Sequence, residues 1–440
     1  MRSRSCGVFV VVLLLVATLS RAVEVRPTQE KMDFWATQRK GANCFNVTID
    51  EAWFKDASRF GIEWVRLAYE KWPGKQRDFL MGNADHFSAI DQEDLRCLKQ
   101  ALDWAHSQNL KVVIAPLGLP GNRWVQKNGG QHDLRLWQDK VWWGQAVAFW
   151  RELAVALKDH PAVYGYNILN EPTPEMNAGL PEESSPERFR EWYAKIKGTA
   201  RDLPRFYETV IAAIREVDSH TPIIVDSGWY ARPAAFSCWP RPADDKVLFS
   251  VHMYEPYEFT NHRNFKKPHP EVYPGPILFD GKKTEWNRKR LEEYFFPFFS
   301  WAASQGIPAH RLMVGEFGCY RRNPGCAAYL ADVIAVLNSR AVHWAFYSFR
   351  EDEWDGFDYE VGTGGLSEKY WREKDAGKNP AVPRSDNPLI RVLRQEFSFG
   401  SPLRPTQGSS SPSRGANPDD SSVCPTDRPS TQPAKSSTDP

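Results

Sequence analysis

The chain has 440 residues, of which 42% are apolar and 25% are charged, so it has enough apolar side chains for a large core and is not disordered as a whole. This length suits one large domain as well as two. The 56 basic and 55 acidic residues balance each other, which argues against nucleic acid or an anionic membrane as the partner.

Residues 1–22 have the pattern of a signal peptide. Two arginines are followed by an apolar run at residues 8–16 and by the small-residue segment Ser20-Arg21-Ala22, where cleavage is expected. The run is much shorter than the roughly 20 residues that span a bilayer, so we predict a secreted protein, extracellular or periplasmic, with no membrane span. Six cysteines remain after loss of Cys6, and export permits disulfides. Neither a CxxC pair nor an HExxH run is present, so we expect no metal and no cofactor.

Apolar, β-rich runs alternate with amphipathic stretches along most of the chain. The expected strands are Gly41–Phe45, Trp64–Ala68, Lys111–Pro116, Val163–Leu169, Ile223–Asp226, Leu248–Met253, Leu312–Glu316 and Val342–Ser348. Helices are expected between them, for example at Gln92–Ser107, Trp142–Lys158 and Pro204–Val217. This alternation predicts an α/β fold, a (β/α)8 TIM barrel over residues 23–400 with long loops at the carboxyl ends of the strands. Those ends hold the active site in such barrels.

The predicted loops at this end are rich in aromatic rings, which suit the C–H faces of sugars, although any single Trp is more often part of the core. The rings are Trp72, Trp124, Trp137, Trp229, Tyr230, Trp239, Tyr257 and Trp354. From Ser401 onward the chain is dominated by Ser, Pro, Thr, Gly and Asp, so residues 401–440 are predicted to be a disordered tail.

Two glutamates follow predicted strands of this barrel. Asn170-Glu171-Pro172 comes at the end of the fourth strand, and Gly315-Glu316-Phe317-Gly318 at the end of the seventh. Burial at a strand end raises the pKa of a carboxyl group, as a general acid requires, and we expect this of Glu171. Cleavage of a glycosidic bond needs one protonated and one ionised carboxyl group, and a separation of about 5 to 5.5 Å gives retention through a covalent intermediate.

Polar side chains on neighbouring strands are candidates for the surroundings of this pair. Arg66 lies between apolar residues of the second strand and needs an anionic partner, which we expect to be Glu316. His252 and Tyr254 lie two residues apart and share a face of the sixth strand, where a Tyr254 hydroxyl would donate to Glu316. Asn170 is placed to donate to a sugar 2-hydroxyl.

These motifs, together with Gly41-Ala42-Asn43, show that residues 35–397 resemble glycoside hydrolase family 5, the cellulase family of retaining barrels. The resemblance implies that Glu171 is the acid/base and Glu316 the nucleophile, with the polar residues above around the reacting sugar. Two positions depart from the family: Leu117 stands where a histidine is usual, and Tyr347 takes the place of a tryptophan platform under the sugar. The resemblance also implies a cis peptide bond from Tyr347 to Ser348.

The expected activity is therefore hydrolysis of a β-linked oligosaccharide, polysaccharide or glycoconjugate by double displacement. A noncatalytic carbohydrate-binding barrel and a transglycosylase using the same intermediate are the alternatives. The loop at residues 350–360, dense in acids and rings, either contacts the glycone or is a solvated surface loop. Cys319 and Cys326 are close enough in sequence for a small disulfide. The sequence leaves the sugar, the linkage and the oligomeric state open.

Overall fold

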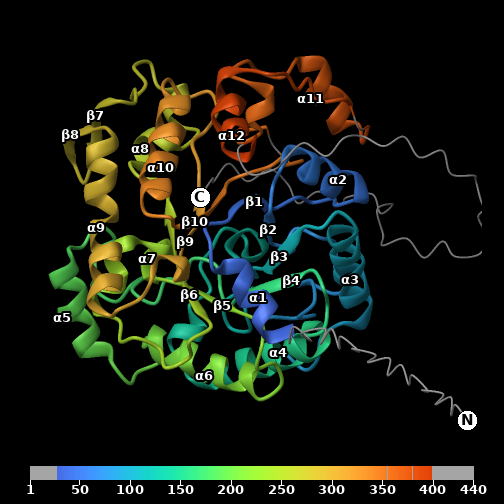
Figure 1. The fold of residues 1–440 in the computed structure, drawn as a ribbon, viewed down its shortest axis with the longest axis vertical. Coiled ribbons are helices and arrows are strands. Elements are labelled where there is room, and N and C mark those ends of the chain that lie inside the picture. Colours follow the sequence, from blue (N-terminus) through green and yellow to red (C-terminus); the bar gives the residue numbers. More distant parts are fainter. Residues whose placement is uncertain (1–26, 354, 379, 399–440) are drawn as a thin grey trace, which may run out of the picture.

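The computed structural model describes residues 27–353, 355–378 and 380–398. The predicted signal peptide and the predicted tail at 401–440 lie outside them. Eight parallel strands close into a barrel in the order β1-β10-β9-β6-β5-β4-β3-β2 (Figure 1). They are β1 (Lys40–Cys44), β2 (Trp64–Leu67), β3 (Lys111–Ile114), β4 (Val163–Asn167), β5 (Ile223–Asp226), β6 (Val247–Met253), β9 (Leu312–Phe317) and β10 (His343–Phe346). The predicted TIM barrel is confirmed, with strand ends that differ by at most two residues.

Helices after the strands cover the outside of the barrel. The longer ones are α2 (Glu51–Phe60), α3 (Gln92–Ser107), α4 (Val141–Leu157), α5 (Pro186–Ile196), α6 (Leu203–Arg215), α9 (Arg288–Ser304), α10 (Cys326–Ser339) and α12 (Pro388–Ser398). Three short ones lie in loops: α7 (Gly228–Ala231), α8 (Tyr257–Thr260) and α11 (Glu368–Asp375). Helix α3 shows why they form here, because the Asp91 side chain accepts from the first free amides and Leu95, Leu98 and Leu102 are buried on one face. Among the described residues, no helix combines the length and apolar character needed to cross a membrane.

The barrel interior changes from apolar to polar along its axis. At the amino-terminal end, helix α1 (Pro27–Trp35) crosses the ring of strands, as Figure 1 shows, and Trp35 is fully buried among inward-facing residues. Its ring packs against Trp64, at 5.2 Å between centroids, and its indole Nε1 donates to the Tyr164 carbonyl at 2.9 Å. The rest of this layer is Val113, Ile224, Leu248, Met313 and Ala345. The polar side chains of the barrel interior therefore lie at its carboxyl-terminal end.

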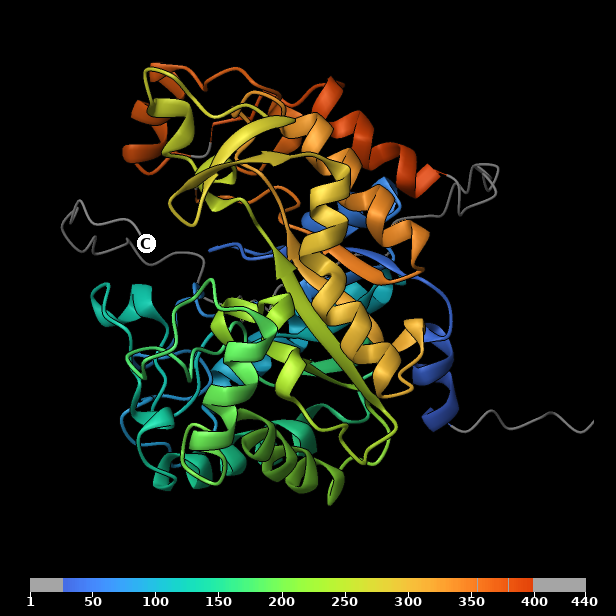
Figure 2. The same cartoon turned by 90° about the vertical axis from the view of Figure 1, so that its left-hand side faces the viewer.

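One β-hairpin outside the barrel was not predicted. Strands β7 (Gly275–Phe279) and β8 (Lys282–Trp286) pair antiparallel and pack on α8 and α9, between β6 and β9 in the chain (Figure 2). The turn residues Asp280 and Gly281 both have positive φ, 47° and 73°. Asp-Gly is a typical sequence for such a two-residue turn, so a signal for the hairpin was present in the sequence.

The predicted disulfide between Cys319 and Cys326 is wrong, because both are free thiols. Cys326 is the first residue of α10, and its Sγ donates to the backbone carbonyl of Cys319 at 3.3 Å. The Cys326 thiol therefore has a main-chain acceptor, and the two sulfurs are not bonded to each other. Both residues are buried, and burial raises the pKa of the Cys319 thiol well above its ordinary value.

Candidate active site

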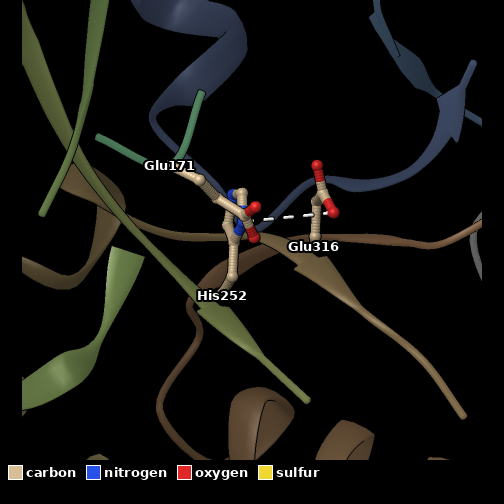
Figure 3. A group of neighbouring side chains, drawn as sticks. All are labelled: Glu171, His252 and Glu316. Atoms are coloured by element: carbon tan, nitrogen blue, oxygen red, sulfur yellow. Dashed lines mark hydrogen bonds and ion pairs between the residues drawn. The ribbon is translucent and has the colours of Figure 1, made fainter. Parts of the chain in front are cut away.

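The structure brings the two glutamates together at the carboxyl-terminal end of the barrel. Glu316 lies on β9, and Glu171 follows β4 in the left-handed region of backbone conformation, with φ of 47°. The Glu171 amide donates to the Asp226 side chain at 3.2 Å, which anchors this turn. One carboxylate oxygen of each glutamate and a ring nitrogen of His252 lie within 4.8 Å of one another. Figure 3 shows the three side chains together, with the His252 ring beside the Glu171 carboxyl group and Glu316 next to them.

Glu316 is buried and accepts hydrogen bonds from two of the predicted neighbours. Arg66 Nη1 lies 2.5 Å from Oε1, and the Tyr254 hydroxyl donates to Oε2 at 2.7 Å. Burial and the neighbouring Glu316 raise the pKa of Tyr254 well above its usual range, so its hydroxyl stays a donor. The guanidinium of Arg66 is itself held by Asn167 Oδ1, at 2.7 Å from Nη2, and by Asn170 Oδ1, at 2.6 Å. Both donors are thus fixed relative to the Glu316 carboxyl group.

Glu171 has a different environment. Its side chain is half-buried, and its Oε1 is 2.8 Å from Nδ1 of His252. Burial raises the pKa of Glu171, and the negative charge of Glu316 acts in the same direction, against the opposing effects of His252 and Arg66. The two carboxyl groups therefore lie in different environments, since Arg66 and Tyr254 contact Glu316 whereas His252 contacts Glu171.

Tyr347 lies beside Tyr254, and its hydroxyl is bound by a residue outside the pair of glutamates. Its ring contacts Tyr254 and Phe45, with centroids 6.5 Å away in each case, and its hydroxyl donates to Glu351 at 3.2 Å. Glu351 is buried and forms an ion pair with Lys71 at 2.8 Å. The Tyr347–Ser348 peptide bond is cis, as the family resemblance implied.

Several residues of this site were not named from the sequence. Asn167 and Asp226 lie on strands β4 and β5 and contact Arg66, and Lys71 anchors Glu351. The available signal was a polar residue at the carboxyl end of an otherwise apolar strand. That signal applies to Asn167 and Asp226 and is absent for Lys71, which lies in a loop.

The aromatic residues predicted in the loops separate into two groups. Trp72, Trp137, Trp229 and Trp239 are buried in the core. Trp124 and Tyr230 are half-buried, Tyr257 is 50% exposed, and Trp354 lies outside the described residues. Tyr230 and Tyr257 both interact electrostatically with Glu171, so the exposed rings are near the acid/base candidate.

The acidic loop after β10 is largely structural. Asp352 accepts from the amides of Val47 and Thr48 at 2.8 and 2.7 Å, which ties the loop to the end of β1. Glu360 pairs with Arg350 at 2.6 Å and is buried. The loop is therefore packed and not simply solvated, and it contacts the site through Glu351 and through Phe357, whose ring centroid is 5.2 Å from that of Tyr347.

Two groups of acidic residues have the spacing of metal ligands in the described part of the chain. The first is Glu171, His252 and Glu316, and the second is Glu182, Glu183 and Glu255. In the second group, Arg232 contacts each of the three carboxylates, at 2.5, 2.6 and 3.1 Å. Protein donors thus already contact the acids of both groups, and neither requires a metal ion to explain it.

Comparison with known proteins gives relatives with several activities. A β-xylosidase of Phanerodontia chrysosporium is 22% identical over 84% of this chain and 71% of its own length. Endoglucanase B of Neocallimastix patriciarum is 23% identical over 67% of this chain, which spans only 54% of that protein. An endoglycoceramidase of Cyanea nozakii is 31% identical, but over only 27% of this chain and 22% of its own length.

Solved structures agree on the fold. Endoglucanase Cel5A of Thermotoga maritima has a TM-score of 0.55 at 19% identity, covering 84% of this chain and all of that one. Residues 27–353 match the family model described as "Cellulase (glycosyl hydrolase family 5)". Because this match extends over well more than half of the sequence, the chain belongs to glycosyl hydrolase family 5 and is a glycosidase.

Proposed function

We propose that this protein is an exported β-glycosidase that works with retention, with Glu316 as nucleophile and Glu171 as acid/base. The observation that carries the proposal is the pair of carboxyl groups whose nearest oxygens lie within 4.8 Å in two contrasting environments. Retaining glycosidases hold their two carboxyl groups about 5 to 5.5 Å apart, and inverting enzymes about 6.5 to 9.5 Å apart. The separation therefore favours a covalent intermediate over direct attack by water.

In the first step, a Glu316 oxygen attacks the anomeric carbon while Glu171 gives its proton to the departing oxygen. Arg66 and Tyr254 donate hydrogen bonds to the Glu316 carboxylate and orient it toward the anomeric carbon. Both groups already carry their protons, so neither takes up the proton that Glu171 transfers. The raised pKa of Glu171 keeps that proton available in the free enzyme. In the second step, Glu171 removes a proton from water, whose oxygen displaces Glu316 from the sugar.

The relatives suggest which substrates to test first. Their names cover xylosidase, endoglucanase, glucan 1,3-β-glucosidase and endoglycoceramidase activities. We therefore propose a β-linked oligosaccharide, polysaccharide or glycoconjugate as the substrate. A screen of aryl β-xylosides and β-glucosides, β-1,3- and β-1,4-gluco-oligosaccharides and a glucosylceramide would identify the sugar. Export is proposed from the signal-like residues 1–22.

The two glutamates are distinguished by chemical rescue with azide. Glu171→Ala should keep much of its glycosylation rate on a 2,4-dinitrophenyl β-glycoside, because this leaving group needs no proton, and azide should yield the β-glycosyl azide. Glu316→Ala should be slow on every substrate, and azide should yield only the α-product. On unactivated substrates each variant should lose about 10²-fold or more.

The matched control is Glu182→Ala, which removes a carboxylate from the same loop as Glu171 but outside the reacting pair. It should react at the wild-type rate and give no azide product. Identical anomers from both glutamate variants, or wild-type activity of either on an unactivated substrate, would contradict the assigned roles.

A further inference from the structure

A third acid, Asp226, lies behind the acid/base candidate. It is the last residue of β5 and is fully buried. Its Oδ2 accepts from the Glu171 amide at 3.2 Å and lies 3.4 Å from Nη2 of Arg66, while Oδ1 accepts from Asn167 at 3.2 Å. The same Oδ2 is 3.6 Å from Nε2 of His252. Asp226 thus contacts the backbone of Glu171 and also its imidazole partner.

The two ring nitrogens of His252 face two different acids. Nδ1 is 2.8 Å from Glu171, whereas Nε2 is fully buried and has no hydrogen-bond acceptor within bonding distance among the described residues. The carboxylate of Asp226, at 3.6 Å, is the negative charge directed at it. A proton on Nε2 is stabilised by that charge, as in other sites where an acid behind an imidazole fixes its tautomer.

We propose that Asp226 is a positioning residue for the acid/base, because its carboxylate keeps a proton on Nε2 of His252 and so directs Nδ1 at Glu171. The inference rests on the proposed role of Glu171. With a proton on both nitrogens, His252 donates from Nδ1 to the Glu171 carboxylate that remains after the first step. It loses no proton itself, because the proton that reaches the leaving group comes from Glu171 and is later replaced from water.

The charges around His252 support this state. Glu171 faces the ring from the segment after β4, and Asp226 and Glu316 face it from β5 and β9, with Glu316 Oε2 at 4.0 Å from Nδ1. Arg66 on β2 is the opposing cation, and Tyr254 directly follows β6, the strand that carries His252. Burial lowers the pKa of His252, but the acids outweigh burial and raise it above its ordinary value.

The first test is the pH profile of kcat/KM for Asp226→Asn, measured with phenyl and 2,4-dinitrophenyl β-glycosides of the sugar found by screening. Asn has nearly the same shape, so the substitution removes mainly the charge. Loss of a negative charge lowers the apparent pKa values of the coupled Glu171 and His252 pair, and we expect the basic limb to move about one unit to lower pH. The phenyl glycoside should lose more activity than the dinitrophenyl glycoside, because only its leaving group needs a proton.

The matched control is Asp218→Asn, which alters another buried aspartate, in the loop that leads into the amino-terminal end of β5. Asp218 accepts from the Tyr166 hydroxyl at 2.9 Å and from the Thr221 amide at 2.9 Å, far from the barrel mouth. This variant should lose stability without any shift of the basic limb. A purely structural role for Asp226 would produce the same result in Asp226→Asn, and that outcome would overturn the proposal.

The second test does not depend on activity. Nitrogen-15 NMR of the protein labelled at its ten histidines reports which ring nitrogens carry protons, and His252→Asn identifies the relevant signal. In the wild type we expect Nε2 of His252 to stay protonated across the pH range in which the fold persists, and in Asp226→Asn the ring should lose a proton at lower pH. A wild-type His252 protonated on Nδ1 alone would refute the inference even if Asp226→Asn did not fold. Inactivity of the wild type with an Nε2 proton present would count against the proposed function instead.

Discussion

Glu175 is a buried acid that forms no ion pair with the other described residues, and its substitution should change how stability depends on pH. Its Oε2 accepts from the Trp229 amide at 2.9 Å, and burial raises the pKa to about 8 from 4.5. The unfolded chain loses this proton near pH 4.5, so the folded state is penalised progressively as pH rises from 4.5 to 8. At about 1.4 kcal/mol per pH unit, the full penalty is about 5 kcal/mol, which is a ceiling because side chains and water relax around a buried charge.

Glu175→Gln should remove this penalty because the amide stays neutral and still offers one oxygen to Trp229. The free energy of unfolding from urea titrations should therefore fall less between pH 5 and pH 9 for the variant than for the wild type, by about 2 to 5 kcal/mol. Glu191→Gln, which changes an exposed acid on α5, is the control and should leave the pH dependence unchanged. Parallel curves for the wild type and Glu175→Gln would refute the reasoning.

Two further substitutions test the role of Tyr347 under the sugar and the role of Trp35 at the amino-terminal end of the barrel. Tyr347→Ala should reduce kcat/KM by about 10-fold or more through loss of ring contact with the sugar, whereas Tyr347→Phe, which loses only the hydrogen bond to Glu351, should have a smaller effect. Unchanged kcat and KM in Tyr347→Ala would rule out the platform. Trp35→Ala should lower the free energy of unfolding by about 3 to 5 kcal/mol, because it leaves a cavity and loses the bond to Tyr164, while kcat at a permissive temperature should be unchanged. A loss below about 1 kcal/mol would contradict the idea that Trp35 stabilises the barrel by filling its amino-terminal end.

The barrel could be predicted from the sequence because buried parallel strands are recognisable as short apolar runs between amphipathic stretches. The partner of Arg66 could be predicted for a similar reason, since an arginine inside an apolar strand needs an acid, and Glu316 lies at 2.5 Å. In both cases the information is local to the strand. Because each glutamate lies at the carboxyl end of a parallel strand, both could be placed at the same end of the barrel.

Other features depend on spatial register, which the local sequence does not contain. The contact of Asp226 with His252 requires β5 and β6 to pair so that Asp226 lies opposite Ser250, two residues before His252 on the same face. The ion pair of Lys71 with Glu351 joins loops 280 residues apart. For Cys326, the spacing allowed a bridge, but its thiol donates to the Cys319 carbonyl. These are properties of the assembled barrel.

The seam where the barrel closes joins the first strand to the last, and helix α12 covers it. Phe397 packs against Trp344 and Phe60, with centroids 5.5 and 5.4 Å away, and Glu396 pairs with Lys40 at 2.7 Å. During synthesis on a ribosome, the edge of β1 therefore stays unpaired until β10, more than 300 residues later in the chain, has been made. A shortened chain ending at residue 353, where the family match stops, would keep β10 but lose α12, and the rings of Trp344 and Phe60 at the seam would lose their cover. We therefore propose that the unit that can fold alone extends through α12.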